Sequence, residues 1–293
     1  MDNLIKLWRP AKAGMKTEQL VKKVVSYGLI VLLLLVILIP LVWVISISFQ
    51  TGDQLRIRIP IQWIPSPVTL QNYIDGFKAE PWLFYLRNNL IWGAGSLVGL
   101  LISTTLVAYA FARMNFRGKN FLFMLNILLM LLPDQVTMVP KFIMFARLGW
   151  IGTFLPVIVP AFLANAPTHT FMLTQFFRTI PRDLSEAARM DGASEFQILW
   201  HIILPLSKPI MAVMVVFHLT WIWSDYLTPL IYLSSPKTQP IVLGLQDFIG
   251  IRGQIGWGPL MAMSFLTALP VVALYFFVQR YFAESFVLSG LKG

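Results

Sequence analysis

The sequence contains no cysteine, only three histidines and few charged residues, which make up 12% of its 293 positions. Without cysteine the chain forms no disulfide and no thiolate metal site. The histidines are scattered, and none stands with carboxylates at the spacing of a metal site. Soluble domains carry about 25% charged residues. A soluble globule of this length could not cover its surface with so few charges, so a soluble enzyme is excluded.

Apolar residues are correspondingly abundant: 57% of the chain is hydrophobic and the mean hydropathy is +0.71. This apolar excess must face lipid. Because a membrane-spanning helix needs about 20 apolar residues, the chain has room for roughly six or seven spans with their connections.

Six apolar segments can be recognised along the chain, and the first, 24–49, is too long for a signal peptide, so we expect it to be retained. We therefore predict an all-α membrane protein with six transmembrane helices. The predicted spans are 24–49, 88–112, a third that begins over 120–132 and meets Pro133 and Pro140, then 154–177, 209–233 and 259–281. The remaining segments are an N-terminal arm (1–23), a loop (50–87), a transmembrane core (88–281) that includes a polar loop at 178–208, and a tail (282–293).

The positive charge of the chain indicates its orientation. The formal net charge is +10, and six spans place both termini, and most of the 23 Lys and Arg residues, on one side. Lys and Arg accumulate in cytoplasmic loops. Both termini and the 178–208 loop are therefore predicted to be cytoplasmic in a multi-pass inner-membrane protein, with the 50–87 loop on the opposite side. Nucleic-acid binding is not needed to explain the charge.

The loop at 178–208 has the signals of a helical hairpin. Pro181 suits a first helical turn, and Gly192 suits the left-handed position that ends a helix. Ser194 and Gln197 have capping-box spacing for a second helix. Apolar and small side chains on this loop favour a surface that a partner grips over a solvated linker: Leu184, Ala187, Ala188, Phe196, Ile198 and Leu199.

One motif in this hairpin is specific. Glu186-Ala187-Ala188 is followed by Gly192 and, after nine intervening residues, by Ile202-x-Leu204-Pro205. This pattern resembles the EAA loop of the membrane subunits of ABC importers. The similarity extends over about residues 85–293 and is closest to the MalG-type permease subunits of binding-protein-dependent carbohydrate importers. The flanking segments that resemble this branch are 175–181, 189–194, 223–230, 279–282 and 290–293.

The resemblance implies a type I ABC importer transmembrane fold and a division of labour between subunits. The chain has no phosphate-binding loop, so ATP and Mg²⁺ are expected on a partner ATPase dimer, and the chain is expected to be no enzyme. The other implied partners are a second homologous membrane subunit, a solute-binding protein and the lipid bilayer. Implied ATPase-coupling residues are Glu186, Ala187, Ala188, Asp191, Gly192, Ile202, Leu204 and Pro205, and the tail would contact the ATPase through Gly290, Lys292 and Gly293.

Polar side chains inside the spans are candidates for the substrate path. Aromatic rings beside amides and carboxylates suit a sugar, whose C–H faces stack while its hydroxyls form hydrogen bonds. Hydrogen bonding between helices is the alternative for each, and for Asp225 it is a cap near Pro229. The family usually has Asn where this chain has Ser224. The candidates are Asn126, Asn165, His169, His218, Trp223, Ser224, Asp225 and Tyr226.

The predicted function is thus import of sugars or oligosaccharides. The net charge of +10 suggests an acidic oligosaccharide such as a polyuronate, although no motif carries this suggestion. Two other classes remain open. An ion-coupled secondary transporter would need buried ionisable residues in mid-membrane, which are nearly absent. A membrane receptor or scaffold would use the hairpin as a docking site and would move no substrate.

Overall fold

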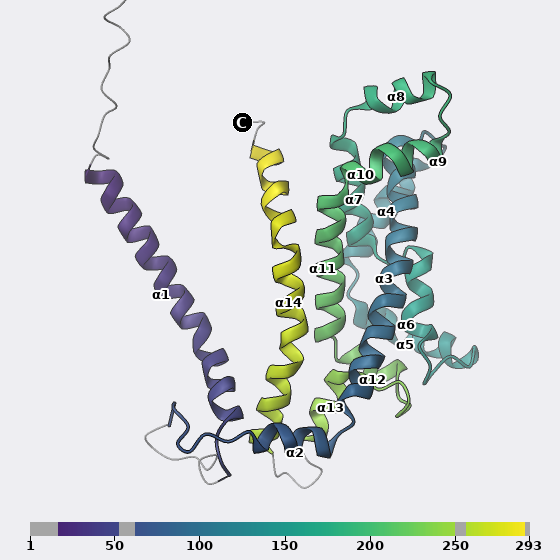
Figure 1. Ribbon diagram of the computed structural model, residues 1–293. Coiled ribbons are helices and arrows are strands. Elements are labelled where there is room, and N and C mark those ends of the chain that lie inside the picture. Colours follow the sequence, from purple (N-terminus) through teal and green to yellow (C-terminus); the bar gives the residue numbers. More distant parts are fainter. Residues whose placement is uncertain (1–16, 53–61, 250–255, 291–293) are drawn as a thin grey trace, which may run out of the picture.

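A computed structural model describes residues 17–52, 62–249 and 256–290, and its elements in these ranges are all helices (Figure 1). In chain order they are α1 (Thr17–Ser48), α2 (Gln71–Ala79), α3 (Trp82–Arg113), α4 (Lys119–Leu131), α5 (Asp134–Arg147), α6 (Leu155–Ile158), the 3-10 helix η2 (Val159–Leu163), α7 (Pro167–Thr179), α8 (Arg182–Met190), α9 (Glu195–Ile198), the π-helix η3 (Leu199–Ile203), α10 (Leu204–Leu206), α11 (Lys208–Ser224), α12 (Leu227–Tyr232), α13 (Ile241–Asp247) and α14 (Trp257–Gly290).

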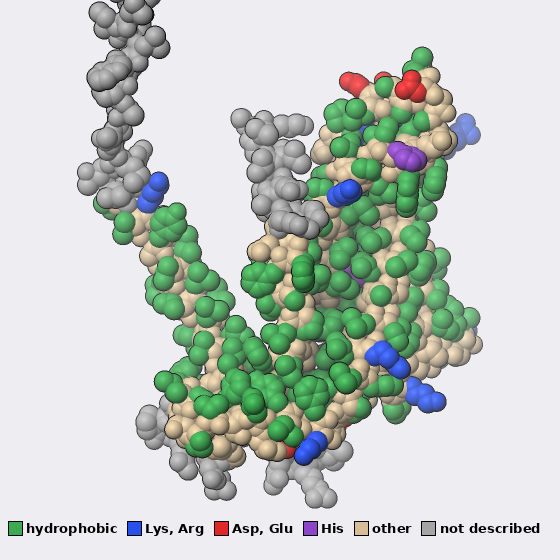
Figure 2. Space-filling model, viewed as in Figure 1, with side chains coloured by type: hydrophobic (Ala, Val, Ile, Leu, Met, Phe, Trp, Pro, Cys, Tyr) green, Lys and Arg blue, Asp and Glu red, His purple; other side chains and the backbone are tan. Residues whose placement is uncertain are grey.

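Three of these helices are long and apolar enough to cross a membrane in the described part of the chain: Val21–Ser48, Trp82–Arg113 and Trp257–Gln279. Two further candidates are bent pairs, α4 with α5 at 100° and α9–α10 with α11 at 77°, which bring the total to as many as five. Figure 2 shows hydrophobic side chains over the flanks of the molecule and most charged ones near its two ends. This distribution fits a protein whose sides face lipid.

The first, second and sixth predicted spans are continuous helices, each of which begins earlier than predicted, and the second and sixth also end later. α3 begins at Trp82, directly after Pro81, within the segment predicted as a loop. α14 continues to Gly290, so the described part of the predicted tail, 282–290, is helical. In the predicted N-terminal arm, residues 17–23 belong to α1, and residues 1–16 lie outside the described part.

The third, fourth and fifth predicted spans are interrupted. α4 ends at Leu131 before Pro133, because a residue that precedes proline is disfavoured in the α conformation. The predicted helix over 154–177 is divided: after α6 and η2 the chain takes a left-handed conformation at Ala164 (φ 55°), and α7 begins at Pro167. The fifth segment breaks at Asp225, between α11 and α12.

The core lies between α3, α7, η3 and α11. Close packing there depends on small residues along α3, as the sequence indicates. A Cβ atom at Gly99 would lie 2.5 Å from the ring of Phe162 on η2, and one at Gly95 would lie 2.7 Å from Ile158 at the end of α6. The glycines therefore allow the broken segment to rest directly on α3.

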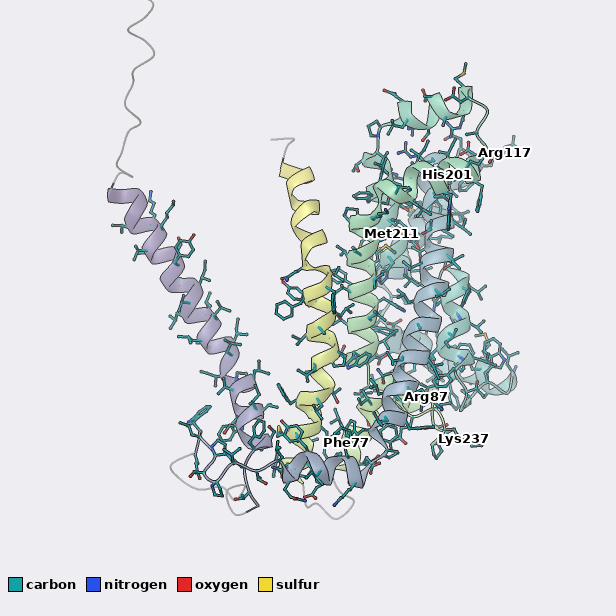
Figure 3. All side chains as sticks on the ribbon, viewed as in Figure 1. Phe77, Arg87, Arg117, His201, Met211 and Lys237 are labelled. Atoms are coloured by element: carbon teal, nitrogen blue, oxygen red, sulfur yellow. The ribbon has the colours of Figure 1, made fainter. Side chains whose placement is uncertain are left out.

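The two ends of the molecule differ in structure. The N-terminal end of α1, the C-terminal end of α14 and the α8–α9 hairpin lie at one end, whereas α2, α12 and α13 lie at the other (Figure 1). Figure 3 places Arg117 and His201 at the hairpin end and Phe77, Arg87 and Lys237 at the opposite end. α1 diverges from α14 toward the hairpin end.

Candidate functional site

The first helix of the hairpin is stabilised by charges at both ends. Asp183 lies in the first turn of α8 and Arg189 in the last, where each charge is favourable to the helix dipole. Pro181 occupies the N-cap position, directly before Arg182, the first residue of the helix. It does not stand inside the first turn as expected. Its fixed φ (here −54°) still prepares the chain for helix entry.

A tight turn reverses the chain after α8. Gly192 has φ +83°, as its sequence context predicts. The amide of Gly192 donates to the carbonyl oxygen of Arg189 (3.0 Å), and that of Ala193 donates to Ala188 (2.9 Å). These two bonds form a Schellman motif, which satisfies carbonyl groups that the helix end leaves free.

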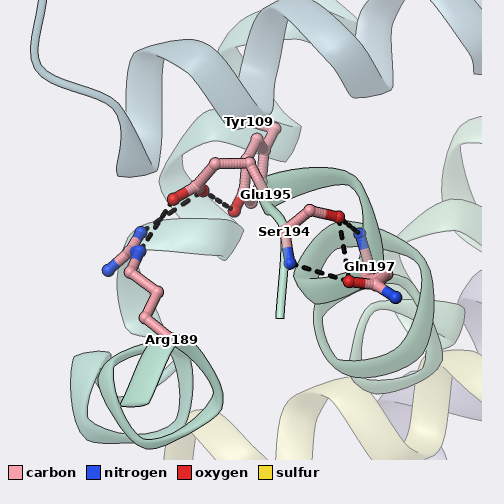
Figure 4. A network of polar contacts seen from close by, with 5 residues as sticks. All are labelled: Tyr109, Arg189, Ser194, Glu195 and Gln197. Atoms are coloured by element: carbon pink, nitrogen blue, oxygen red, sulfur yellow. Dashed lines mark hydrogen bonds and ion pairs between the residues drawn. The ribbon is translucent and has the colours of Figure 1, made fainter. Parts of the chain in front are cut away.

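The predicted capping box opens the second helix of the hairpin. The amide of Gln197 donates to Ser194 Oγ (3.3 Å), and the amide of Ser194 donates to Gln197 Oε1 (2.8 Å) (Figure 4). Both ends of the turn are therefore held by local hydrogen bonds, and the hairpin has a defined shape.

The structure divides the predicted coupling residues into two groups. Ala188, Ile202 and Leu204 pack against the apolar core. The remaining five are exposed: Glu186, Ala187, Asp191, Gly192 and Pro205. The hairpin thus has an outward face of small and acidic residues and an inward face that fixes it to the spans.

Large apolar side chains flank the outward face. Met190 is 88% exposed, Phe196 66% and Trp200 59%. The rings of Phe196 and Trp200 stack with centroids 6.3 Å apart. Apolar groups exposed in this way mark a surface for a protein partner or for the membrane.

The inward face is part of the main core. Ile198 and Ile203 are fully buried, and Leu199 nearly so, against Leu173 and Phe177 of α7. Burial of a side chain of this size contributes about 1.5–3 kcal/mol. The second half of the hairpin is therefore firmly attached to the spans.

A polar network joins the hairpin to α3 (Figure 4). The hydroxyl of Tyr109 donates to Glu195 Oε2 (2.5 Å), and Arg189 Nε lies 2.7 Å from Glu195 Oε1. Arg189 Nη2 also donates to Glu195 Oε2 (3.3 Å). The hydrogen bond from Arg189, followed by that from Tyr109, holds the pKa of the Glu195 carboxyl below its usual value.

Tyr109, Glu195 and Arg113 are absent from the sequence-based set of site residues. Arg113, in the last turn of α3, donates to backbone carbonyls at the end of α7. For Arg113, the one signal in the sequence was its position between an apolar span and a short basic turn. Nothing in the sequence pairs Tyr109 with Glu195, because they stand far apart along the chain.

Two of the substrate-path candidates meet in the core. The ring centroids of His169 on α7 and His218 on α11 are 6.1 Å apart. His218 Nε2 lies 3.0 Å from Ser96 Oγ on α3. His169 Nε2 is buried and has no hydrogen-bond partner within the described residues. The predicted role of this pair stays a prediction.

Two asparagine candidates lie near the break before α7. The amide of Asn126 on α4 donates to the carbonyl oxygen of Pro167 (3.1 Å), so it joins two helices. Asn165 is exposed within the break itself. The contact of Asn126 corresponds to the structural alternative for a polar residue inside a span.

The remaining candidates lie at the end of α11, at the end of the molecule opposite the hairpin. Trp223 Nε1 donates to the carbonyl oxygen of Thr267 on α14 (2.8 Å), and the Tyr226 hydroxyl lies 2.7 Å from Gln246 Oε1. Ser224 donates to carbonyl groups of its own helix. The eight candidates therefore do not form one cluster.

Asp225 lies one position before Tyr226, the N-cap of α12, and contacts the start of that helix. Its Oδ1 accepts a hydrogen bond from the amide of Thr228 at the start of α12 (3.2 Å). Its Oδ2 is buried without a partner in the part of the chain that the structure describes.

Known proteins resemble this chain in sequence and in fold. Residues 95–287 match the family described as "binding-protein-dependent transport system inner membrane component". The arabinooligosaccharides transport system permease protein AraQ of Halalkalibacterium halodurans is 33% identical over 256 residues, which cover 87% of this chain and 91% of that protein. The galactooligosaccharides transport system permease protein GanQ of Bacillus subtilis is 28% identical over 284 residues, 96% of this chain and 99% of that protein.

A solved structure has the same fold. It is described as the crystal structure of a bacterial ABC transporter involved in the import of the acidic polysaccharide alginate. The match has a TM-score of 0.80 and 21% sequence identity, and it covers 92% of this chain and 100% of the other.

Proposed function

Because the chain belongs to the family of binding-protein-dependent transport system inner membrane components, we propose that it forms half of the translocation path of an ATP-driven oligosaccharide importer. Two relatives, AraQ and GanQ, are named for the transport of oligosaccharides. The observation that carries the proposal is the hairpin, which presents exposed small, acidic and apolar residues while its other face is buried in the bundle.

We propose a six-span arrangement with both termini in the cytoplasm. The spans would be α1, α3, α4–α5, α6–α7, α11–α12 and α14. Three long apolar helices, the bent pair α4–α5 and the apolar helix α11 of the second bent pair support it. The N-terminal end of α1 and the C-terminal end of α14 also lie at the same end of the molecule as the hairpin (Figure 1). The bias of Lys and Arg toward that side supports the orientation.

The hairpin would dock on an ATPase dimer, which holds ATP and Mg²⁺. The carboxylates of Glu186 and Asp191 are exposed and free to pair with cations of the partner, and the side chain of Met190 would enter an apolar groove. Gly290 at the end of α14, with Lys292 and Gly293, would add a second contact; the last two residues lie outside the described part. Closure of the ATPase would then move the hairpin and the spans attached to it.

The remaining partners would cover other surfaces. A second, homologous membrane subunit and the bilayer would cover the exposed apolar side chains of α1, such as Leu33 and Ile37. A solute-binding protein would meet the opposite end of the molecule, where α2, α12 and α13 lie (Figure 1).

The substrate would pass beside the polar candidates of α7 and α11. The narrower proposal of an acidic oligosaccharide rests on the net charge of +10. None of the eight path candidates is Lys or Arg, so only the basic residues at the end opposite the hairpin, such as Arg87 and Lys237 (Figure 3), would act on the approach of an acidic substrate. Uptake of neutral and uronate oligosaccharides should therefore be compared at several salt concentrations.

Purification of the complex tests the function. The chain is produced with its neighbouring gene products, purified and reconstituted into proteoliposomes. We expect an ATPase subunit to co-purify, and its hydrolysis and oligosaccharide uptake to rise with loaded binding protein. Uptake driven by an ion gradient without ATP would indicate a secondary transporter instead. A complex that contains no ATPase and moves no substrate would support the receptor or scaffold alternative.

A further inference from the structure

We propose that Tyr109, Glu195 and Arg189 form a polar latch, which makes the coupling hairpin and α3 move as one body. The carboxylate of Glu195 is shared between the two other side chains and therefore connects three helices, α3, α8 and α9 (Figure 4). The inference rests on the proposed function and assigns positioning roles to residues outside the EAA pattern.

α8 carries the exposed docking residues of the hairpin. Only Ser185 is buried among the residues of this helix, and Ala188 is partly buried. Figure 1 shows α8 at the edge of the molecule, beyond α9 and α10. A force applied to α8 reaches the bundle through its junction with α7 at Ile180, through the turn at Gly192 with the packing of Ala188, and through the Arg189–Glu195 ion pair. The ion pair is thus a direct cross-link between the two arms of the hairpin.

Tyr109 is the member of the latch that belongs to α3. Its ring is 4% exposed and belongs to the core cluster that also contains Ile198 and Leu199 of the hairpin. The buried ring fixes the position of the hydroxyl, which bonds to Glu195. Removal of the hydroxyl alone would leave this packing in place and cut only the polar link.

The other end of α3 is held to the loop before α13. The amide nitrogen of Asn88 donates to the carbonyl oxygens of Lys237 (3.2 Å) and Gln239 (2.8 Å). Asn89 Oδ1 accepts from the amide of Ile241 (2.9 Å). A helix transmits displacement along its axis, so α3 would connect the hairpin to the surface proposed for the binding protein.

The latch has the character of a positioning device rather than a source of stability. The side chains of Arg189 and Glu195 are 40% and 41% exposed. Ion pairs at such exposed positions contribute little to the free energy of unfolding. Loss of the latch should therefore leave the subunit folded and change how motion is transmitted.

The test uses the whole reconstituted complex with Tyr109→Phe, Glu195→Gln and both together. Couplings between distant sites typically amount to about 5–150-fold. We expect stimulation of the ATPase by loaded binding protein, and substrate moved per ATP, to fall about fivefold or more, while assembly and basal hydrolysis stay unchanged. Coupling in the double variant should be no lower than in the more affected single variant, because both changes break the same link.

Tyr232→Phe is the matched control, since it also removes one hydroxyl from a buried ring, here bonded to the carbonyl oxygen of Met138. It should leave coupling unchanged. Equal loss in the control, or normal coupling in both latch variants, overturns the proposal. If the wild-type complex itself moves no substrate, the proposed function fails rather than the latch.

A direct distance measurement addresses the latch without transport. Spin labels are attached at Arg182→Cys on α8 and Ile102→Cys on α3 in the cysteine-free chain. With the latch intact, we expect one narrow distance distribution with and without nucleotide. With Glu195→Gln the distribution should broaden, and Arg189→Glu combined with Glu195→Arg should narrow it again. Identical distributions in all three complexes would overturn the proposal.

Discussion

Arg113 at the end of α3 holds Ile180 at the start of the hairpin: its Nη2 lies 2.6 Å from the carbonyl oxygen of Ile180 and 2.7 Å from that of Phe177. The last carbonyl groups of a helix have no partner within the helix, and a cation beside them is favourable. One guanidinium group thus fixes the point at which α7 leads into α8.

Replacement of Arg113 should therefore destabilise this junction. Hydrogen bonds to charged groups contribute about 1.5–3 kcal/mol, so we expect Arg113→Ala to lower the free energy of unfolding by about 2–4 kcal/mol. Arg113→Lys should lose less, because it keeps the charge but not the forked donor. Thermal unfolding of the purified complex, followed by tryptophan fluorescence, measures the order of stability among the wild type and the two variants. Equal midpoints for the wild type and Arg113→Ala would contradict it.

The turn at Gly192 gives a second prediction. A Cβ atom there would meet nothing within 4 Å, so the cost of a side chain comes only from φ +83°. Asn tolerates this conformation, whereas a β-branched residue does not. Gly192→Asn should couple like the wild type, while Gly192→Val should lose stimulated ATPase activity. Gly192→Pro should be worse, because it also removes the hydrogen bond to Arg189.

The stability that Glu195 contributes should depend on pH. The folded-state pKa of this carboxyl lies below its usual 4.5, because Arg189 and Tyr109 stabilise the charged form. The stabilisation that Glu195 contributes is therefore complete above the pKa of the unfolded state. It is lost as the pH falls through the lower pKa of the folded state. The stability difference between the wild type and Glu195→Gln should be constant above about pH 5.5 and shrink below it. Its size should not exceed about 1 kcal/mol, since the pair is partly solvated.

Local signals in the sequence predicted the hairpin well. Gly192 and the pair Ser194 and Gln197 act within a few residues, so their geometry follows from their own spacing. The EAA pattern identified the family, which the match over residues 95–287 confirms. The hydrophobic runs likewise located the three continuous helices, because hydropathy reports directly on lipid exposure.

Long-range features of the structure could not be predicted from the sequence. The breaks at Ala164 and Asp225 lie inside apolar runs, and hydropathy carries no information on the backbone conformation there. The bond between Tyr109 and Glu195 joins residues 86 positions apart. Such a contact depends on how α3 packs against the hairpin, which no local pattern encodes. For the same reason the eight path candidates could be named, but their separation into several places could not be predicted.

The contact between Gly99 and Phe162 gives the last prediction. A Cβ atom at Gly99 would lie 2.5–2.9 Å from three ring atoms of Phe162, so the ring must move. Overpacking of this kind costs about 1–3 kcal/mol, whereas replacing an unconstrained helix glycine with alanine is favourable by roughly 0.5–1 kcal/mol. Gly99→Ala should therefore lower the unfolding midpoint, and Gly28→Ala on α1, which meets nothing within 4 Å, should not. Trimming the neighbour with Phe162→Leu should recover part of the loss. If Gly99→Ala unfolded no earlier than Gly28→Ala, the broken segment would not rest on α3 as closely as these distances require.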